Sequence, residues 1–193
     1  MTGKGIRVGF DKARAAAALC GMLLLGGCAG VQVGQYAAAQ PALELPRYFN
    51  GTVDGWGMFQ SRSGEVVKRF HVVIAADWKM QEGREVGTLD ERFSWSDGTT
   101  SRRVWTVTRT GDKQFSGRAD DVVGEARGEA AGNALRWQYV LALPVDGRVW
   151  NVDVDDWMFL MDDQVMLNRS AVSKFGIHVG DITLSFRKRQ GPP

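Results

Sequence analysis

The sequence predicts an all-β fold, an antiparallel up-and-down meander of about eight to ten strands that closes into a barrel. Apolar and polar residues alternate over long runs from residue 48 onward, as they do in half-buried strands. Turn-forming pairs such as Asp97-Gly98 separate these runs about every 15 residues. Closure removes the exposed edges of so long a meander, so we prefer a barrel and keep a β-sandwich as the second choice.

Residues 1–27 have the pattern of an export signal peptide. Four basic residues precede a short apolar run, residues 15–25, which ends in Leu25-Gly26-Gly27-Cys28. The run is too short for a membrane-spanning helix, which needs about 20 apolar residues. These last four residues resemble the lipobox of bacterial lipoproteins, which implies that Cys28 becomes the first mature residue and carries acyl chains such as palmitate. Because Ala29 rather than Asp follows, the resemblance implies the outer membrane, facing the periplasm.

Composition narrows the classes of function. Removal of 27 residues from the 193 leaves 166, enough for one domain with its own core. The remaining chain carries 20 basic and 21 acidic side chains, so its charge gives no case for a nucleic-acid partner. Cys20 belongs to the signal and Cys28 would carry the lipid, which leaves no free thiol for a disulfide, a metal site or a nucleophile.

After the signal the chain divides into a lipidated tether, residues 28–46, and a barrel domain, residues 47–190. The tether is rich in Ala and Gly and ends near Pro41 and Pro46. Within the domain, residues 120–131 contain Gly124 and Gly128 and would make a poor helix, because each glycine costs about 1 kcal/mol there. We therefore expect strand in that segment as well.

The expected strands follow the alternating runs in order. One apolar face extends from Phe70 through every second residue to Trp78, and further runs cover residues 135–143, 150–155 and 182–187. Tight hairpin turns need a positive φ, which the chain supplies at Ser63-Gly64, Asp97-Gly98, Gly132-Asn133 and Asp146-Gly147.

The first strand contains Gly55-Trp56-Gly57. Lipocalin-like barrels begin with a Gly-x-Trp whose indole plugs the barrel floor beneath a basic residue from the last strand. This resemblance implies that Trp56 is the plug and Arg187 its cover, in a lipocalin-like barrel. An ordinary core tryptophan is the alternative.

Asp153, Asp155 and Asp156 form the densest acidic cluster. In a strand, Asp155 shares a face with Trp157 while Asp156 points the other way, so at least one carboxylate should lie near the interior. A buried carboxylate needs partners, and Arg169 and Lys174 are the nearest candidates in sequence. Solvated or ion-paired carboxylates at a strand end are the alternative interpretation, since two same-face carboxylates supply only part of a calcium site.

On a larger scale the domain resembles a family of proteobacterial lipoproteins known as domain of unknown function 3833. The resemblance covers most of residues 46–186, and it implies an envelope address and a compact β domain. It supplies no reaction, ligand or catalytic residue. The matching stretches are Tyr48-Phe-Asn-Gly51, Gly55-Trp-Gly-Met58, Trp95-Ser-Asp-Gly98, Arg103-Val-Trp105, Ala119-Asp-Asp-Val122, Gly132-Asn-Ala-Leu135, Asp155-Asp-Trp-Met158, Asn168-Arg169 and Lys174-Phe-Gly176.

Motifs for catalysis are missing from the sequence. His71 and His178 lie far apart, and no nucleophile elbow, phosphate loop or dinucleotide fingerprint occurs. We therefore expect no metal, no cofactor and no catalytic residue. The candidate ligand-binding residues, besides Cys28 for lipid attachment, are Trp56, Asp155, Asp156, Trp157, Asn168 and Lys174.

Together these features predict a lipid-anchored envelope protein whose lipocalin-like barrel binds a small apolar or amphipathic ligand. One alternative is a structural or interaction module whose barrel is filled by its own side chains. A second alternative is an enzyme on a hydrophobic or sugar substrate, with Asp155, Asp156 or Lys174 as acid and base. Fold alone does not choose among the three.

Overall fold

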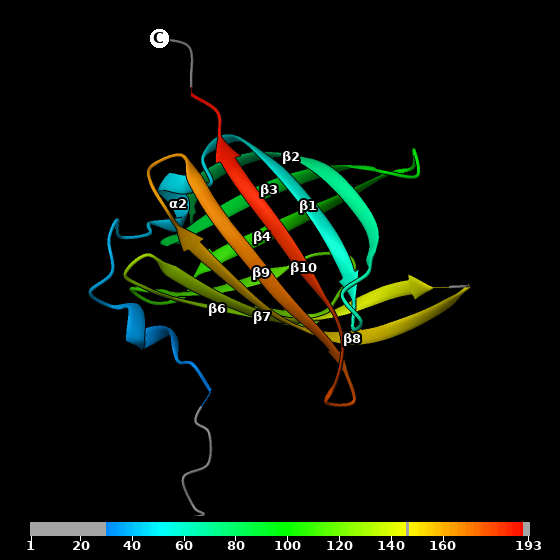
Figure 1. Ribbon diagram of the computed structural model, residues 1–193. Coiled ribbons are helices and arrows are strands. Elements are labelled where there is room, and N and C mark those ends of the chain that lie inside the picture. Colours follow the sequence, from blue (N-terminus) through cyan, green and yellow to red (C-terminus); the bar gives the residue numbers. More distant parts are fainter. Residues whose placement is uncertain (1–29, 146, 191–193) are drawn as a thin grey trace, which may run out of the picture. The chain divides into compact units, whose positions relative to one another are not determined.

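The computed structural model describes residues 30–145 and 147–190. In this part of the chain ten strands form one closed antiparallel barrel, in which β10 pairs back onto β1 (Figure 1). The predicted all-β meander and its closure are therefore confirmed. The elements are η1 (Val33–Tyr36), α2 (Leu45–Tyr48), β1 (Gly51–Ser61), β2 (Val66–Gln81), β3 (Arg84–Trp95), β4 (Thr100–Arg109), β5 (Gln114–Arg118), β6 (Val122–Ala131), β7 (Ala134–Val145), β8 (Arg148–Leu160), β9 (Val165–Lys174) and β10 (Ile177–Lys188).

The barrel has two different ends. The segment Leu43–Phe49, which includes α2, lies across one end, which we call the closed end (Figure 1). The opposite end carries the β1–β2, β3–β4, β5–β6, β7–β8 and β9–β10 turns, and we call it the open end. Among the described residues no helix is long and apolar enough to span a membrane.

The closed end is sealed by apolar side chains from the segment before β1. Leu43, Leu45, Tyr48 and Phe49 are all buried there. The Trp78 Nε1–H donates a hydrogen bond to the Phe49 carbonyl at 2.6 Å, and Tyr48 Oη donates one to the Gln164 carbonyl at 2.8 Å. Burial of this segment excludes water from the barrel floor.

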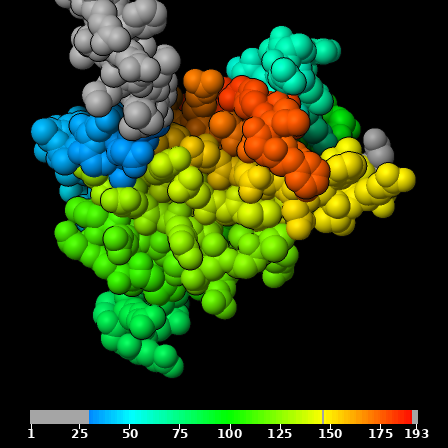
Figure 2. Space-filling view, turned by 90° about the horizontal axis from the view of Figure 1, so that it is seen from below, coloured from blue at the N-terminus to red at the C-terminus, as the bar shows by residue number. Residues whose placement is uncertain are grey.

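Part of the expected tether is packed against the barrel. Within residues 28–46, the structure places residues 33–46 on the barrel wall and across its closed end. The ring of Tyr36 lies edge-on to Phe159, with 5.1 Å between the ring centroids, and Leu43 N donates to the Gly132 carbonyl at 2.7 Å. Figure 2 shows this segment in blue beside the yellow-green strands, in agreement with the contacts of η1 with β6 and β7.

Aromatic rings lie on inward-facing glycines in the barrel. A Cβ atom on Gly87 would lie 2.5 Å from the Trp78 ring, and one on Gly128 would lie 2.2 Å from the Trp137 ring. These distances are well inside van der Waals contact, so only glycine leaves room for the indoles. Pairs of glycine and tryptophan on neighbouring strands thus fill the interior towards the closed end.

Most turns follow the predicted glycine chemistry. Gly64, Gly98, Gly132 and Gly147 all have positive φ at the hairpins where the sequence predicts turns. The β9–β10 hairpin instead turns through Phe175, with φ 52°, and Gly176. An aromatic residue rarely adopts this conformation, which explains why the sequence gives no clear turn signal there.

Within residues 120–131, residues 122–131 form strand rather than helix, as expected. This strand is β6, which has an irregular register with β7 between Val123 and Arg127. Gly124 adopts φ 75° at this irregularity, where a β-bulge curves the strand. Gly124 therefore allows a bend in the barrel wall, and Gly128 leaves space for the Trp137 ring.

Candidate functional site

A set of polar side chains gathers in the barrel between its main core and the open end, and Asp121 joins this set from the β5–β6 turn, where its side chain is 37% exposed. On β3, β7 and β8 the inward residues directly on either side of the cluster are apolar, and further towards the closed end Glu85 on β3 pairs with Arg109 on β4 at 2.8 Å. On β3, for example, Glu91 lies between Leu89 and Phe93, and on β8 Asp156 lies between Met158 and Val154. We call this set the buried polar cluster, and its members are Glu91, Arg103, Asp121, Tyr139, Asp156, Asn168 and Ser170.

Asp156 is one anchor of the cluster. Its side chain is 7% exposed, and its Oδ1 accepts hydrogen bonds from Asn168 Nδ2 and, at 2.9 Å, from Ser170 Oγ. Burial raises the pKa of Asp156 to about 6, although the Asn168 and Ser170 hydrogen bonds oppose this rise. Asp156 therefore keeps a proton at higher pH than an exposed Asp does.

Glu91 and Arg103 face each other across the β3–β4 pair. Arg103 Nη1 lies 3.8 Å from Glu91 Oε2, which is an ion pair without a hydrogen bond. The same guanidinium binds Asp121 more closely, with Nη2 donating to Oδ2 at 2.7 Å and Nε donating at 2.9 Å. Arg103 is therefore committed chiefly to Asp121.

The Oε2 atom of Glu91 is buried and has no hydrogen-bond partner among the described residues. Burial, together with the charges of Asp121 and Asp156, raises the pKa of Glu91 to about 7 against the opposing charge of Arg103. Burial disfavours the charge of Arg103, but Glu91, Tyr139 and Asp121 outweigh that effect and raise its pKa above the usual value. Arg103 is thus a permanent cation beside carboxyl groups that hold protons near neutral pH.

Tyr139 completes the cluster from β7. Burial and then the charge of Asp156 raise the pKa of its phenol, so the hydroxyl stays protonated and can donate a hydrogen bond. These mutual influences show that residues from β3, β4, β7 and β8 share one poorly hydrated interior. The arrangement can hold a polar group of a ligand, because its donors and acceptors are shielded from competing water.

Aromatic and aliphatic side chains lie between the cluster and the open end. Phe93 stacks on Trp95 with 5.5 Å between the ring centroids, and Phe70 packs against both rings. The other partly buried apolar residues of this half include Phe59, Leu141 and Ile182. They form an apolar lining above a polar floor.

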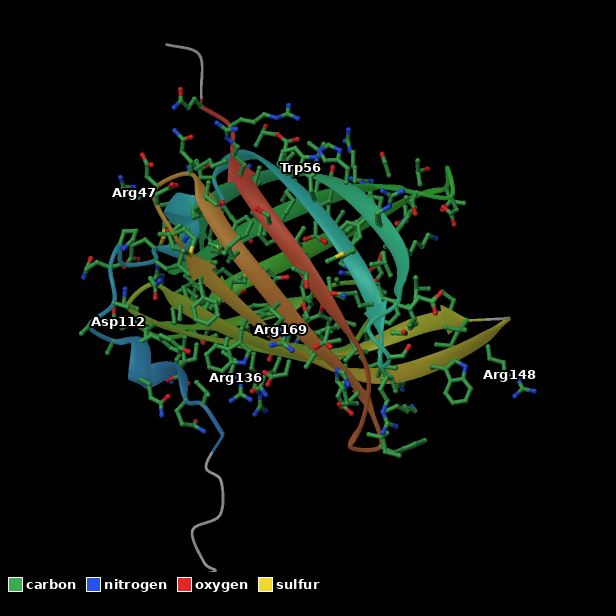
Figure 3. All side chains as sticks on the ribbon, viewed as in Figure 1. Arg47, Trp56, Asp112, Arg136, Arg148 and Arg169 are labelled. Carbon is green, nitrogen blue, oxygen red and sulfur yellow. The ribbon has the colours of Figure 1, made fainter. Side chains whose placement is uncertain are left out.

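The rim of the open end exposes large apolar side chains on two hairpins. Trp150 is 42% exposed on β8, and Phe175 is 84% exposed at the β9–β10 turn. Lys174 Nζ lies 5.8 Å from the Trp150 ring and 4.5 Å from the Phe175 ring. Arg148 lies near the tip of the β7–β8 hairpin, which projects from the barrel (Figure 3).

The structure brings together two of the six candidate ligand-binding residues, Asp156 and Asn168. Asp155 lies on the face opposite Asp156, as predicted; this is the outer face, where Asp155 accepts hydrogen bonds from Arg136 at 2.7 and 2.9 Å. Trp157 also faces outward and stacks on Phe159, with 6.0 Å between centroids. Lys174 lies at the rim, where its ammonium donates to the Asn151 carbonyl.

The proposed acid and base, Asp155, Asp156 and Lys174, therefore do not converge. Asp155 is on the outer surface, Asp156 is in the interior and Lys174 is at the open end. Arg169 and Lys174 are also not the partners of the buried carboxylate, contrary to expectation. An amide and a hydroxyl on β9 take that role, because the β8–β9 register sets Ser170 opposite Asp156.

The prediction that Trp56 plugs the barrel floor is wrong. Gly55 and Gly57 face the interior, so alternation turns Trp56 outward, where it is 52% exposed and lies 5.3 Å from the His71 ring. Arg187 is likewise exposed and covers no indole. The floor is closed instead by Tyr48 and Phe49, which precede the strand.

Sequence reasoning missed Glu91, Arg103, Asp121, Tyr139 and Ser170. A signal was present, since Glu91 interrupts the apolar face Leu89-x-Glu91-x-Phe93. Cys28 and the signal segment lie outside the described residues. In the described ranges no three His, Cys, Asp or Glu side chains gather as they would around a metal ion.

A separate depression of about 460 Å³ lies on the wall near the closed end, between β1, β2 and β3. Its lining includes Thr52, Asp77, Lys79 and Thr88, which face outward. The Lys79 ammonium is paired with Asp77 at 2.8 Å. This hollow is small-residue surface, and it does not connect the members of the buried polar cluster.

Comparison with known proteins gives a family and a fold. The model of a family described as "Protein of unknown function (DUF3833)" matches residues 22–188. No curated protein matches the chain. Among solved structures, the S-type phycobiliprotein lyase CPES from Guillardia theta superposes with a TM-score of 0.59 and 6% sequence identity. The alignment covers 84% of this chain and 100% of that chain, and at this identity it shows the shared barrel fold alone.

Proposed function

This chain belongs to the DUF3833 family, and we propose that it is a lipid-anchored protein of the bacterial envelope whose lipocalin-like barrel binds a small amphipathic molecule. The ligand enters at the open end with its polar group towards the buried polar cluster. Its apolar part then lies along the lining of Phe70, Phe93 and Leu141. The observation that carries this proposal is the buried polar cluster beneath an apolar lining.

A barrel built only for stability has no use for such a cluster. Buried charges cost free energy unless they are paired and hydrogen-bonded, and apolar residues of similar volume often give a more stable interior. The half near the closed end follows that rule, with Leu89, Trp105 and Leu135 in the equivalent inward positions. The presence of Glu91 with a buried oxygen that accepts no hydrogen bond from the described part of the chain is therefore better explained by binding than by packing.

The architecture is suited to this role. Barrels of about eight strands can enclose one small ligand, and the wider ten-strand barrel leaves at least as much interior to fill. The solved neighbour from Guillardia theta is a lyase by name, so a barrel of this topology can serve a protein that acts on a partner molecule. Which molecule this chain binds has to come from its own side chains.

The proposed location in the bacterial envelope is inferred from the lipobox-like Leu25-Gly26-Gly27-Cys28. We expect cleavage before Cys28, acylation of that residue and sorting to the outer membrane. Cys28→Ser should abolish metabolic labelling with a radioactive fatty acid and release the protein from membranes. Unchanged labelling would contradict the anchor, and co-fractionation with inner-membrane markers would contradict the sorting.

Native mass spectrometry tests the ligand directly. Protein purified from its own membrane should carry a bound small molecule that the Asp156→Leu variant lacks. A matched titration uses octanol as a neutral amphiphile and the intrinsic tryptophan fluorescence as the readout, to which Trp105 beside Arg103 contributes. Saturable binding of one octanol per chain supports the proposal. The absence of both a copurified small molecule and octanol binding would overturn it.

The second candidate is a filled barrel that serves as an interaction module of the envelope. The aromatic rings packed on Gly57, Gly87 and Gly128 favour it, since they leave little free volume beside them. The same experiments separate the candidates, because a filled barrel takes up no octanol.

A further inference from the structure

We infer that the molecule held in the barrel carries a cationic or hydrogen-bond-donating head group, of which an aliphatic amine is the simplest, and that carboxylates are disfavoured. This inference rests on the proposed function and names the chemical class of its ligand. It follows from the balance of charge and of donors in the buried polar cluster.

The cluster has more carboxyl groups than cations. Glu91 and Asp156 in the interior, and Asp121 at its edge with a side chain that is 37% exposed, lie around a single guanidinium, that of Arg103. An incoming ammonium would reduce this imbalance, whereas an incoming carboxylate would increase it. Inside a poorly hydrated site such differences are larger than in water.

Arg103 is not free to receive a carboxylate. It donates to both carboxylate oxygens of Asp121 at 2.7 to 3.0 Å and faces Glu91 on its other side. A fatty acid would have to displace Asp121, and the displaced carboxylate would then lose its partner. The paired N–H donors with which Arg103 could bind a ligand carboxylate are therefore already occupied by Asp121.

The cluster instead has a vacant acceptor. Glu91 Oε2 is buried and accepts no hydrogen bond from the described residues. An unsatisfied buried acceptor costs about 1–3 kcal/mol, which a ligand N–H or O–H donor would recover. An ammonium has three donors and so can serve Glu91 while a second N–H reaches a neighbouring acceptor.

The protonation of Glu91 supports the same conclusion. Without a ligand, burial raises its pKa to about 7, so the carboxyl group holds a proton in part of the molecules at neutral pH. A bound ammonium would take the place of that proton and stabilise the carboxylate. Asp121, Asp156, Arg103 and Tyr139 face the same space, and Arg103 and Tyr139 stay protonated throughout.

The test compares three ligands of equal chain length: octylamine, octanol and octanoate. The purified full chain in the Cys28→Ser background, which removes the acylation site, is titrated with each by calorimetry at pH 7. A charge-assisted hydrogen bond is worth about 1.5–3 kcal/mol, so octylamine should bind about 10-fold or more tightly than octanoate. Octanol should fall between them.

Glu91→Gln should remove most of the amine preference and leave octanol affinity within about 3-fold of its original value, because the shape of the site is kept. Glu129→Gln, an exposed carboxylate on the outer face of β6, is the matched control and should change none of the three affinities. Calorimetry in two buffers of different ionisation enthalpy measures the protons released when octylamine binds, and this tests the inference in a chain that keeps Glu91. Octylamine should displace roughly half a proton per chain at pH 7.

The outcomes distinguish this inference from the proposed function. Equal affinity for all three ligands, or tighter binding of octanoate, would overturn the inference and leave a ligand-binding barrel intact. Absence of binding by all three would overturn the proposed function itself. If Glu91→Gln does not fold, the ranking of the three ligands and the proton release in the unaltered site still decide the matter.

Discussion

Leu89 and Phe93 lie two residues to either side of Glu91 on the same inward face of β3, yet they belong to different environments. Leu89 is 8% exposed and packs in the main core with Trp105 and Val107. Phe93 is only partly buried, and beyond it the face continues to Trp95 near the open end. One strand thus passes from the main core, against which Phe93 also packs, to a partly buried end near the β3–β4 turn, with the carboxyl group of Glu91 between Leu89 and Phe93.

The two halves differ in what their side chains do. Near the closed end, large side chains lie opposite small ones: the rings of Trp78 and Trp137 pack on glycines. Towards the open end, the polar groups of the cluster are held at the cost of free energy, and the apolar lining stays partly exposed. On the proposed function, the closed half would supply stability and the open half would supply recognition.

The largest effect should come from the closed half. Leu135 is 1% exposed in the main core, so Leu135→Ala should lower the free energy of unfolding by about 2–5 kcal/mol through lost contacts and a cavity. Chemical denaturation measures the loss. Leu167→Ala, on the outer face and 45% exposed, is the control and should cost far less. Equal losses for the two variants would show that the core does not lie where the structure puts it.

The next largest effect is a pH dependence of the unfolding free energy, and it should come from the carboxyl groups of Asp156 and Glu91 at the boundary between the two halves. The pKa of Asp156 is raised to about 6 from 3.8, and that of Glu91 to about 7 from 4.5, so both acids bind protons more strongly in the folded state. Their contribution to stability is complete below about pH 4 and is lost as pH rises through 6 and 7, by on the order of 3 kcal/mol for Asp156.

Unfolding free energies at pH 5 and pH 8 test this dependence. Asp156→Asn keeps the hydrogen-bond acceptor without the charge, so the variant should gain stability relative to the original chain at pH 8 and show a smaller loss between the two pH values. Ser170→Ala keeps the carboxyl group and removes a hydrogen bond that opposes the rise in its pKa, so this variant should show the full dependence or a larger one. A stability that rises from pH 5 to pH 8 equally in all three proteins would contradict a costly buried carboxylate.

Sequence alone predicted the closed half better than the open half. Alternation identified Val72, Ile74 and Leu135 as inward residues, because a strand reports its own facing directly. It could not show that Glu91, Arg103 and Asp156 share an interior, since that depends on strand tilt and register around the whole barrel. Nor could it show that Leu45 and Tyr48 close the floor, because the segment has no periodic pattern and is fixed by tertiary contacts.

A smaller effect should come from the fit of rings to glycines. A Cβ on Gly128 would lie 2.2 Å from Trp137 Cε3, so Gly128→Ala should cost about 1–3 kcal/mol by forcing the indole to move. Gly34→Ala is the matched control, because a Cβ there would meet no atom within 4 Å. Thermal unfolding compares the two, and a neutral Gly128→Ala would mean that the interior near Trp137 is looser than the structure shows.

The smallest effect should come from Trp56, although its position in the sequence resembles that of a barrel plug. The side chain is 52% exposed and its indole contacts His71 on the outer surface, so Trp56→Ala should cost less than about 1 kcal/mol. A buried tryptophan in the plug position would cost about 3–5 kcal/mol on truncation. Trp137→Ala, which removes an indole that is 6% exposed, supplies that larger reference value in the same chain. If Trp56→Ala were as costly as Trp137→Ala, the first strand would be shifted by one residue and the glycines beside Trp56 would face solvent. A small cost together with unchanged octanol binding would assign the floor of this barrel to Tyr48 and Phe49, so that stability at the closed end rests on the segment before the first strand.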